Sequence, residues 1–331
     1  MSETRRVLVI GDETAEWKIA GLRQIERLLL AINEDDARKQ TVSEITLRGV
    51  TRVALTHPRL RNLRLTSDAG EEAGAYELVL TTRSVPYRQK AEDASFASDY
   101  VNAPEDIPKI ERRLLRATAD ADDGVISQWF DRHLSRAVTR WLLRVPITPN
   151  ECSAAITVLP LSAFFFLVRG SYWGFVGAMA LYEMQSVLDG CDGEIARAKY
   201  LESENGRKFD AACDLASTLL LVLGLGLGLH GQNHATAGLL YLVEGLSAFV
   251  FIATQWAITS YRQVSFGGMA RGATRSRVAR LLDQLAKRDL AHLTFLVLAL
   301  VRLTPWILHT LFIYSLGGLV LTLRSLRDHK R

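Results

Sequence analysis

The stretch LDGCDGEIARAKYLESENGRKFDAACD, residues 188–214, decides the fold of this chain. It carries four aspartates, Asp189, Asp192, Asp210 and Asp214, and it joins two long apolar runs that are typical of membrane-spanning helices. An ionisable side chain at membrane depth costs roughly 2.5–3.5 kcal/mol on insertion scales, so four carboxylates at helical spacing need a shared positive ligand. We expect that ligand to be a divalent metal ion.

The two halves of the 331-residue chain differ in composition, because the first is charged and polar whereas the second consists of long apolar runs. This contrast predicts a membrane enzyme with a soluble head domain. The formal net charge of +4 is too small to indicate a nucleic-acid partner. Cys152, Cys191 and Cys213 have no metal-binding spacing and are expected to be buried fillers.

Residues 1–120 are expected to form a small cytoplasmic α/β domain. Short apolar runs indicate strands, and amphipathic stretches indicate two helices. The predicted strands are Val7–Ile10, Ile45–Leu47, Val53–Leu55 and Leu78–Leu80, and the predicted helices are Ile19–Ile32 and Pro104–Ala117. The apolar run near the N-terminus is only four residues long, too short for a signal-peptide core, which favours a cytoplasmic head.

Residues 121–147 are expected to form an interfacial amphipathic helix and a linker. Between Gly124 and Arg144, apolar residues that include Trp129 and Trp141 alternate with a basic face, a pattern typical of helices that lie in the membrane interface. The basic residues are Arg132, Arg136 and Arg140. An ordinary amphipathic helix packed on the head is the alternative.

Residues 148–331 are expected to form a mainly α, six-helix transmembrane bundle. The predicted spans are about Ser153–Val168, Tyr172–Leu188, Leu215–Leu229, Ala237–Ile258, Leu290–Leu303 and Trp306–Leu323. Several are shorter than the roughly 20 residues that a perpendicular helix needs, so the second and third must extend into the acidic stretch. Basic residues gather at alternate connections, which predicts an inner-membrane protein with both termini and the acidic stretch on the cytoplasmic side.

The spacing of the aspartates predicts a metal site. On helices, Asp189 and Asp192 would project from one face, as would Asp210 and Asp214, and the loop between the pairs is long enough to bring both faces together. Carboxylate oxygens suit Mg²⁺ or Mn²⁺, and such an ion retains positions for substrate phosphate. Together with small neighbouring residues and Arg197, the acids indicate a nucleotide diphosphate pocket.

The stretch resembles the signature of the CDP-alcohol phosphotransferases (CDP-alcohol phosphatidyltransferases), D-x-x-D-G-x-x-A-R followed by G-x-x-x-D-x-x-x-D. The residues that fit it are Asp189, Asp192, Gly193, Ala196, Arg197, Gly206, Asp210 and Asp214. Thr148-Pro149-Asn150, at the entry to the first span, extends the resemblance, and the family's six-helix layout would cover about residues 124–331.

This resemblance implies roles for the signature residues. Asp189, Asp192 and Asp210 would hold the metal, and Asp214 would either complete a two-metal site or deprotonate the acceptor hydroxyl, which makes Asp210 and Asp214 the expected catalytic residues. The residues expected to line the CDP site are Gly193, Ala196, Arg197 and Gly206. Lys287 and Arg288, which open the fifth span, resemble the family's basic entry to that helix and are the expected acceptor site.

The implied function is transfer of a phospho-alcohol (phosphatidyl) group from a CDP-linked donor, with release of CMP, in phospholipid biosynthesis. CDP-diacylglycerol is the expected donor and an alcohol or polyol phosphate the expected acceptor, within a membrane homodimer. A cation transporter and a non-catalytic membrane scaffold are the alternatives from other classes. Glu183 and Glu244 lie inside predicted spans, and their roles are open.

The head resembles a degenerate nucleotidyltransferase domain, as in fused inositol-1-phosphate cytidylyltransferase/di-myo-inositol-phosphate-phosphate synthases. Val7–Gly11 and Ile19–Arg27 resemble the first strand of that fold and the helix after it. The intervening DETAEWK lacks the glycine-rich loop that wraps triphosphate oxygens, so the head is expected to be catalytically inactive. The resemblance also implies an alternative function, the joining of CDP-inositol to inositol phosphate.

Overall fold

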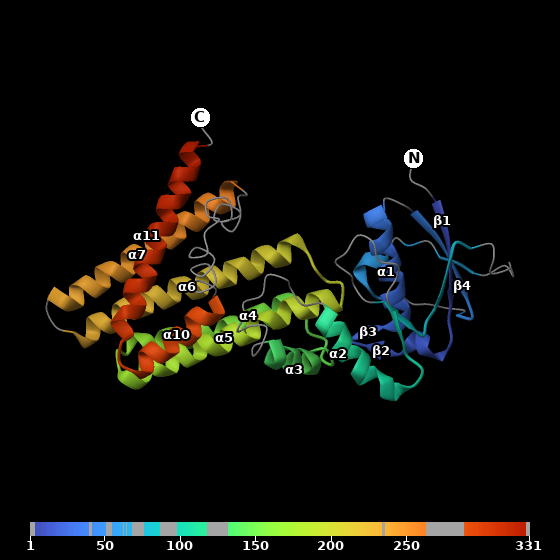
Figure 1. Cartoon of the computed structure of the whole chain (residues 1–331), viewed down its shortest axis with the longest axis horizontal. Coiled ribbons are helices and arrows are strands. Elements are labelled where there is room, and N and C mark those ends of the chain that lie inside the picture. The colour runs from blue at the N-terminus through green and yellow to red at the C-terminus, as the bar shows by residue number, and fades with distance from the viewer. Residues whose placement is uncertain are drawn as a thin grey trace, which may run out of the picture. The chain divides into compact units, whose positions relative to one another are not determined.

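The computed structural model describes residues 4–39, 42–50, 55–61, 63, 65–67, 76–86, 98–117, 132–233, 236–262 and 288–328. The chain forms two compact units, and Figure 1 shows their elements. The first consists of Met1–Ala121, Thr139–Ile147 and Glu194–Leu201, and the second of Asp122–Val138, Thr148–Gly193 and Glu202–Arg331. The first unit thus contains a short piece of chain that directly follows Asp192 and Gly193.

The head is built on a four-stranded parallel sheet with the strand order β5-β4-β1-β6. Its strands are β1 (Thr4–Ile10), β4 (Val42–Arg48), β5 (Leu65–Ser67) and β6 (Leu78–Thr81). The strands predicted at residues 7–10, 45–47 and 78–80 are therefore confirmed. The strand predicted at Val53–Leu55 falls mainly outside the described residues.

The predicted helix Ile19–Ile32 is correct in type but wrong at its start. Strands β2 (Lys18–Ile19) and β3 (Leu22–Arg23) form a small antiparallel hairpin. Helix α1 (Gln24–Lys39) begins only after it. Ala20 and Gly21 at the turn have φ angles of 49° and 74°, in the left-handed region that a right-handed helix excludes. The apolar face of α1 then packs on the sheet, with Ile25, Leu28 and Leu29 fully buried.

The rest of the head completes a small α/β fold. The antiparallel pair β7 (Ser84–Pro86) and β8 (Ser98–Tyr100) precedes a short 3-10 turn, Pro104–Asp106, and helix α2 (Ile107–Ala117). The predicted helix Pro104–Ala117 is thus confirmed, with a 3-10 first turn. Further 3-10 turns lie at Glu13–Glu16 and Pro58–Leu60.

The described residues after the head are mainly helical (Figure 1). Its helices are α3 (Arg132–Leu142), α4 (Pro149–Val168), α5 (Tyr172–Ala198), α6 (Glu204–Gln232), α7 (Thr236–Arg262), α10 (Arg288–Leu300) and α11 (Thr304–Asp328). Within the described residues, four of these, α4, α6, α7 and α11, are long and apolar enough to cross a membrane. Helix α5 contains the second predicted span, and α10 is a shorter apolar helix, so the six-span count stays a prediction.

Small residues allow the helices of the second unit to approach closely. Helix α6 packs against both α4 and α7, and α7 packs against α11. A Cβ atom added at Gly228 would lie 2.0 Å from the Leu167 carbonyl oxygen of α4, and one at Gly226 would lie 3.1 Å from the Gly245 Cα of α7. Backbone contact of this kind is typical of helix pairs in membranes.

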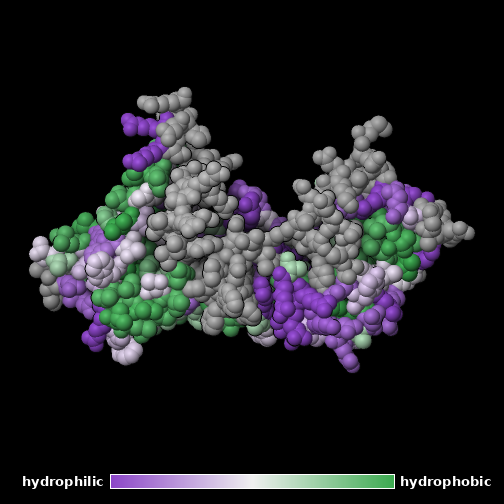
Figure 2. Space-filling view, viewed as in Figure 1, coloured by the Kyte–Doolittle hydropathy of each residue, from purple (hydrophilic) through white to green (hydrophobic). Residues whose placement is uncertain are grey.

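The surface of the second unit is strongly apolar. Hydrophobic side chains gather over its helices in Figure 2, and the exposed ones include Phe165, Trp173, Leu240, Trp306 and Ile313. Large apolar surface of this extent is typical of helices in contact with lipid.

Candidate metal centre and its surroundings

The acidic stretch extends two helices rather than forming a long loop. Helix α5 continues without a break through Asp189 and Asp192 to Ala198, and α6 begins at Glu204, before Asp210 and Asp214. Ser203 caps the start of α6, where its hydroxyl accepts a hydrogen bond of 3.0 Å from the Gly206 N–H. All four aspartates are therefore held on helical backbone, as the spacing predicts.

Asp189, Asp210 and Asp214 converge. One carboxylate oxygen from each lies within 4.8 Å of the others, and all three residues are partly buried. Three like charges at this separation repel one another, whereas a hard divalent cation between them would neutralise the repulsion and accept all three oxygens as ligands. The donor set fits Mg²⁺ or Mn²⁺, ions that keep further coordination positions for substrate oxygens.

Asp192 is oriented differently from the other three aspartates. It is buried, its Oδ1 accepts a 2.5 Å hydrogen bond from the Gly193 N–H, and its Oδ2 accepts one from the Ser153 hydroxyl of α4. The Asp210 side chain is close enough to hydrogen-bond with it. Asp192 thus links α4 to the acidic cluster, and direct contact between Asp192 and the metal stays a prediction.

Ser153 is a site residue that sequence reasoning missed. It is buried, and besides Asp192 its hydroxyl reaches the Pro149 carbonyl oxygen at 3.2 Å. A serine one turn inside an apolar helix gives no local signal, because its partner lies 39 positions further along the chain. The only pointer in the sequence is its closeness to Thr148-Pro149-Asn150.

We expect Ser153→Ala to weaken Mn²⁺ binding by roughly tenfold, because partners of ligand carboxylates typically contribute 10- to 100-fold to metal affinity. Calorimetric titration of the purified protein with Mn²⁺ measures this. Ser162→Ala is the matched control, since Ser162 lies on the same helix and its hydroxyl bonds only the Val158 carbonyl oxygen among the described contacts. Equal Mn²⁺ affinity in the Ser153 variant and the control would contradict the expected role.

The starts of α4 and α6 lie together. Thr148 and Glu151 form a reciprocal capping box at the start of α4, with bonds of 3.3 and 2.8 Å. A Cβ atom at Gly206 would lie 3.3 Å from the Asn150 Oδ1, so the entry segment of the first span contacts the second half of the signature. A side chain at this position would require the Ser203 and Asn150 side chains to shift by a few tenths of an ångström.

Hydrogen bonds further along the helices fix the alignment of α5 with α6. The Tyr182 hydroxyl donates to the Ser217 carbonyl oxygen at 2.9 Å, and the Gln185 amide donates to the Ser217 hydroxyl at 3.0 Å. Ser217 lies three residues after Asp214, and Gln185 four before Asp189. These bonds hold the two acidic faces in register.

The remaining predicted site residues lie either further along α5 or outside the described residues. Gly193, Ala196 and Arg197 continue along α5, where Ala196 and Arg197 are partly buried. Arg288 begins α10, but its side chain and all of Lys287 lie outside the described residues, so the acceptor site stays a prediction.

The structure also describes the two acids that lie inside predicted spans, Glu183 and Glu244. Glu244 pairs with His309, with 2.7 Å between the Glu244 Oε1 and the His309 Nδ1, and so joins α7 to α11. Glu183 is partly buried on α5.

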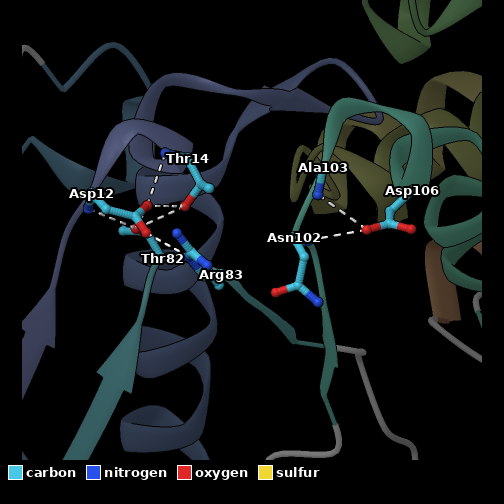
Figure 3. Close-up of polar contacts among 7 residues, drawn as sticks. All are labelled: Asp12, Thr14, Thr82, Arg83, Asn102, Ala103 and Asp106. Atoms are coloured by element: carbon cyan, nitrogen blue, oxygen red, sulfur yellow. Dashed lines mark hydrogen bonds and ion pairs between the residues drawn. The ribbon is translucent and has the colours of Figure 1, made fainter.

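The head has a carboxylate with several hydrogen-bond partners next to its parallel sheet. Asp12 follows β1, at the carboxyl edge of the parallel sheet, which is where ligands bind in open α/β folds. Figure 3 shows its partners: the Thr14 N–H at 2.9 Å, the Thr82 hydroxyl at 3.1 Å and the Arg83 Nε at 2.6 Å. Burial acts to raise the pKa of Asp12, but the hydrogen bonds from Thr14 and Arg83 outweigh it and hold that pKa well below its usual range.

Figure 3 also shows Asp106, whose carboxylate accepts the N–H groups of Asn102 and Ala103, each at 3.1 Å, and so fixes the start of the turn before α2. Both acids of this view are thus engaged with the head's own groups. The charge of Asp12 is compensated by the Arg83 guanidinium, and neither group is free to bind a ligand in this arrangement.

Comparison with known proteins finds a family match for the helical part of the chain. Residues 146–268 match the family described as CDP-alcohol phosphatidyltransferase. Three similar proteins are each named bifunctional IPC transferase and DIPP synthase. The one from Rubrobacter xylanophilus is 34% identical over 53% of this chain and 39% of its own length, and the one from Thermococcus kodakarensis is 34% identical over 34% and 26%. The one from Archaeoglobus fulgidus is 31% identical over 34% of this chain and 22% of its own length. The chain thus spans two fifths or less of the length of these relatives.

Proposed function

Since residues 146–268 belong to the CDP-alcohol phosphatidyltransferase family, we propose that this chain transfers a phospho-alcohol group from a CDP-linked donor to an alcohol or polyol phosphate, with release of CMP. The observation that carries the proposal is the convergence of Asp189, Asp210 and Asp214 from two helices that also carry the rest of the family signature.

The chemistry of the site follows from charge. A pyrophosphate donor brings negative charge that must be neutralised before CMP can leave, and a divalent metal ion bound by Asp189, Asp210 and Asp214 would supply this neutralisation. Arg197, on the next turns of α5, offers a planar guanidinium for a phosphate oxygen. Gly193, Ala196 and Gly206 would line the nucleotide site.

The acceptor hydroxyl must lose a proton as its oxygen attacks phosphorus. Asp214, whose carboxylate lies in the acidic cluster on α6, would either take up this proton or complete the metal site. Asp210, one turn earlier on α6, would orient the part of the site around Asp214. Lys287 and Arg288 would bind an acceptor phosphate. A carboxylate in this position contributes by general base catalysis.

The site would lie at the cytoplasmic side of the inner membrane. The four candidate spans and the exposed apolar surface support insertion in a bilayer. The basic residues between the spans support the orientation, and Leu134 and Trp141, exposed on α3, support an interfacial role for that helix. A homodimer is part of the same proposal.

Two donors are candidates. CDP-diacylglycerol is the donor expected for a phospholipid product, and the lipid-exposed helices favour it. CDP-inositol with inositol phosphate as acceptor is the second candidate, and the names of the three relatives favour that one. The segment DETAEWK after the first strand lacks a glycine-rich loop, which supports a head that does not itself make the donor.

A panel assay tests the proposal and separates the donors. Purified full-length protein with Mg²⁺ or Mn²⁺ is offered CDP-diacylglycerol or CDP-inositol, each with inositol phosphate, glycerol phosphate or serine, and products are identified by mass. We expect CMP release with one donor and its abolition by chelation of the metal. Absence of CMP release from every pair, with metal binding intact, would favour a scaffold.

A cation transporter predicts a different result, namely metal flux into liposomes without nucleotide. The acids speak against it, because Asp189 and Asp192 lie near the end of α5, and Asp210 and Asp214 near the start of α6. They therefore gather at one end of the helices instead of following the length of a path.

A further inference from the structure

The end of α5 that carries Ala196 and Arg197 belongs to the compact head, since Glu194–Leu201 is part of the first unit. The turn that closes this helix is a Schellman motif: the Leu201 N–H donates to the Ala196 carbonyl oxygen at 2.8 Å, and the Tyr200 N–H donates to that of Arg197 at 3.4 Å. The two signature residues are thus fixed through their own backbone carbonyls.

Tyr200 occupies the position in this turn where glycine is usual. Its φ angle is 55°, a left-handed conformation that disfavours a bulky side chain. The ring is 3% exposed and belongs to the same core as Val7, Ile25 and Leu80 of the head. Burial of the aromatic ring offsets the cost of the backbone conformation, so the head's core holds this turn closed.

His57 of the head binds the same turn. Its Nδ1 accepts the Arg59 N–H at 3.2 Å, which leaves the proton on Nε2, and Nε2 donates to the Lys199 carbonyl oxygen at 2.9 Å. His57 is buried, and burial lowers its pKa despite the bond to Lys199, so the neutral ring is favoured. A carbonyl at a helix end that has no helical partner is thereby satisfied.

Glu26 on α1 fixes the loop that carries His57. Its Oε1 accepts the Thr56 N–H at 2.6 Å, the Thr56 hydroxyl at 2.8 Å and the His57 N–H at 3.0 Å. Arg23 pairs with the same carboxylate at 3.2 Å. The contact with α5 therefore rests on a rigid element of the head.

Lys199 connects this assembly to the entry of α4. Its ammonium group donates to the Val145 carbonyl oxygen at 3.4 Å and to that of Ile147 at 3.1 Å, directly before Thr148 begins the α4 cap. A Cβ atom at Gly21 would lie 2.8 Å from the Lys199 Cε, so the head's hairpin packs on the lysine stem. One residue thereby fixes both the end of α5 and the segment that leads into α4.

From these contacts we infer that the head is a positioning module for the nucleotide subsite, with His57 and Tyr200 as positioning residues that hold the Ala196–Arg197 turn of α5 in the shape that binds CDP. The inference rests on the proposed function, which places the nucleotide at that turn. The inference assigns a role in the reaction to a domain that has Asp12, and no glycine-rich phosphate loop, after its first strand.

The test compares His57→Ala with His57→Gln in full-length protein. Glutamine places an amide N–H near the position of Nε2, whereas alanine removes the donor. We expect His57→Ala to raise the KM for the CDP-linked donor and the Kd for CMP by roughly fivefold, the effect of one lost hydrogen bond, with kcat and the half-saturating Mn²⁺ concentration little changed. His57→Gln should restore most of the affinity.

Two further variants exclude a general loss of stability. Asp12→Asn disrupts a polar network whose described partners, Thr14, Thr82 and Arg83, all lie in the head, and it should leave CMP affinity unchanged. Lys199→Met keeps the aliphatic stem but loses the bonds to Val145 and Ile147, and it should weaken CMP binding as His57→Ala does. Hydrogen exchange of the Tyr200 and Leu201 amides should accelerate in both weakened variants.

Unchanged CMP affinity in His57→Ala, while wild-type protein binds CMP, would overturn the inference and leave the proposed function intact. Equal weakening by Asp12→Asn would also overturn it, because the cause would then be instability of the head. Wild-type protein that neither binds nor releases CMP would refute the proposed function itself.

Discussion

Asp214→Asn should lower the rate of CMP release by at least about a hundredfold, the lower range of what a positioned general base contributes. Asparagine has nearly the same shape as aspartate, so α6 should stay intact while the negative oxygen is lost. A single-turnover assay with saturating donor and acceptor measures the chemical step. Glu204→Gln is the matched control, because Glu204 is an exposed acid on the same helix whose described partners are Arg207 and Lys208.

The same variant separates the two roles considered for Asp214. If it is the base, Asp214→Asn should bind Mn²⁺ nearly as well as wild type while the rate falls. If it is a metal ligand, Mn²⁺ affinity should fall together with the rate, as it should in Asp189→Asn. Undiminished activity in Asp214→Asn would refute both assignments.

Gly228→Ala should destabilise the helical unit by about 1–3 kcal/mol, the usual cost of forcing extra volume into a packed contact. The added methyl would lie 2.0 Å from the Leu167 carbonyl oxygen and 3.1 Å from the Phe175 ring, so α4 and α6 must separate. The midpoint of thermal unfolding in detergent should fall by several degrees. Ser153 lies on α4, and Asp210 and Asp214 lie on α6, so activity should fall as well.

Gly231→Ala provides the control for that prediction. It makes the same substitution in α6 one turn later, where a Cβ atom would meet nothing within 4 Å. Alanine favours a helix over glycine by about 1 kcal/mol, so the midpoint should stay level or rise. A similar decrease for both variants would show that packing at Gly228 is not the cause.

Local sequence patterns predicted those parts of the structure that depend on neighbours along the chain. The strands at Val7–Ile10 and Leu78–Leu80 and the helix at Pro104–Ala117 follow from apolar spacing and helix-start signals. The convergence of Asp189, Asp210 and Asp214 follows from spacings of three and four residues on helical backbone.

Features that depend on distant partners could not be predicted in this way. Ser153 and Asp192 are 39 residues apart, and Glu244 and His309 are 65 apart, so neither pair has a local pattern. The left-handed turn at Tyr200 is contrary to residue preference and becomes intelligible only once its ring is seen in the head's core. The hairpin before α1 was not predicted, because the apolar residues of Ile19–Ile32 have the spacing of a helix.

The buried ring of Tyr200 has a consequence for synthesis of the protein. A head made only of residues 1–121 would be complete before the ribosome reaches the first apolar helix, as is usual for N-terminal domains. Here the core acquires Tyr200 only when residue 200 has emerged, after α4 and all of α5 have been made. The head can therefore complete its core only after α4 and α5 have been synthesised, so its folding is coupled in time to synthesis of the helical unit.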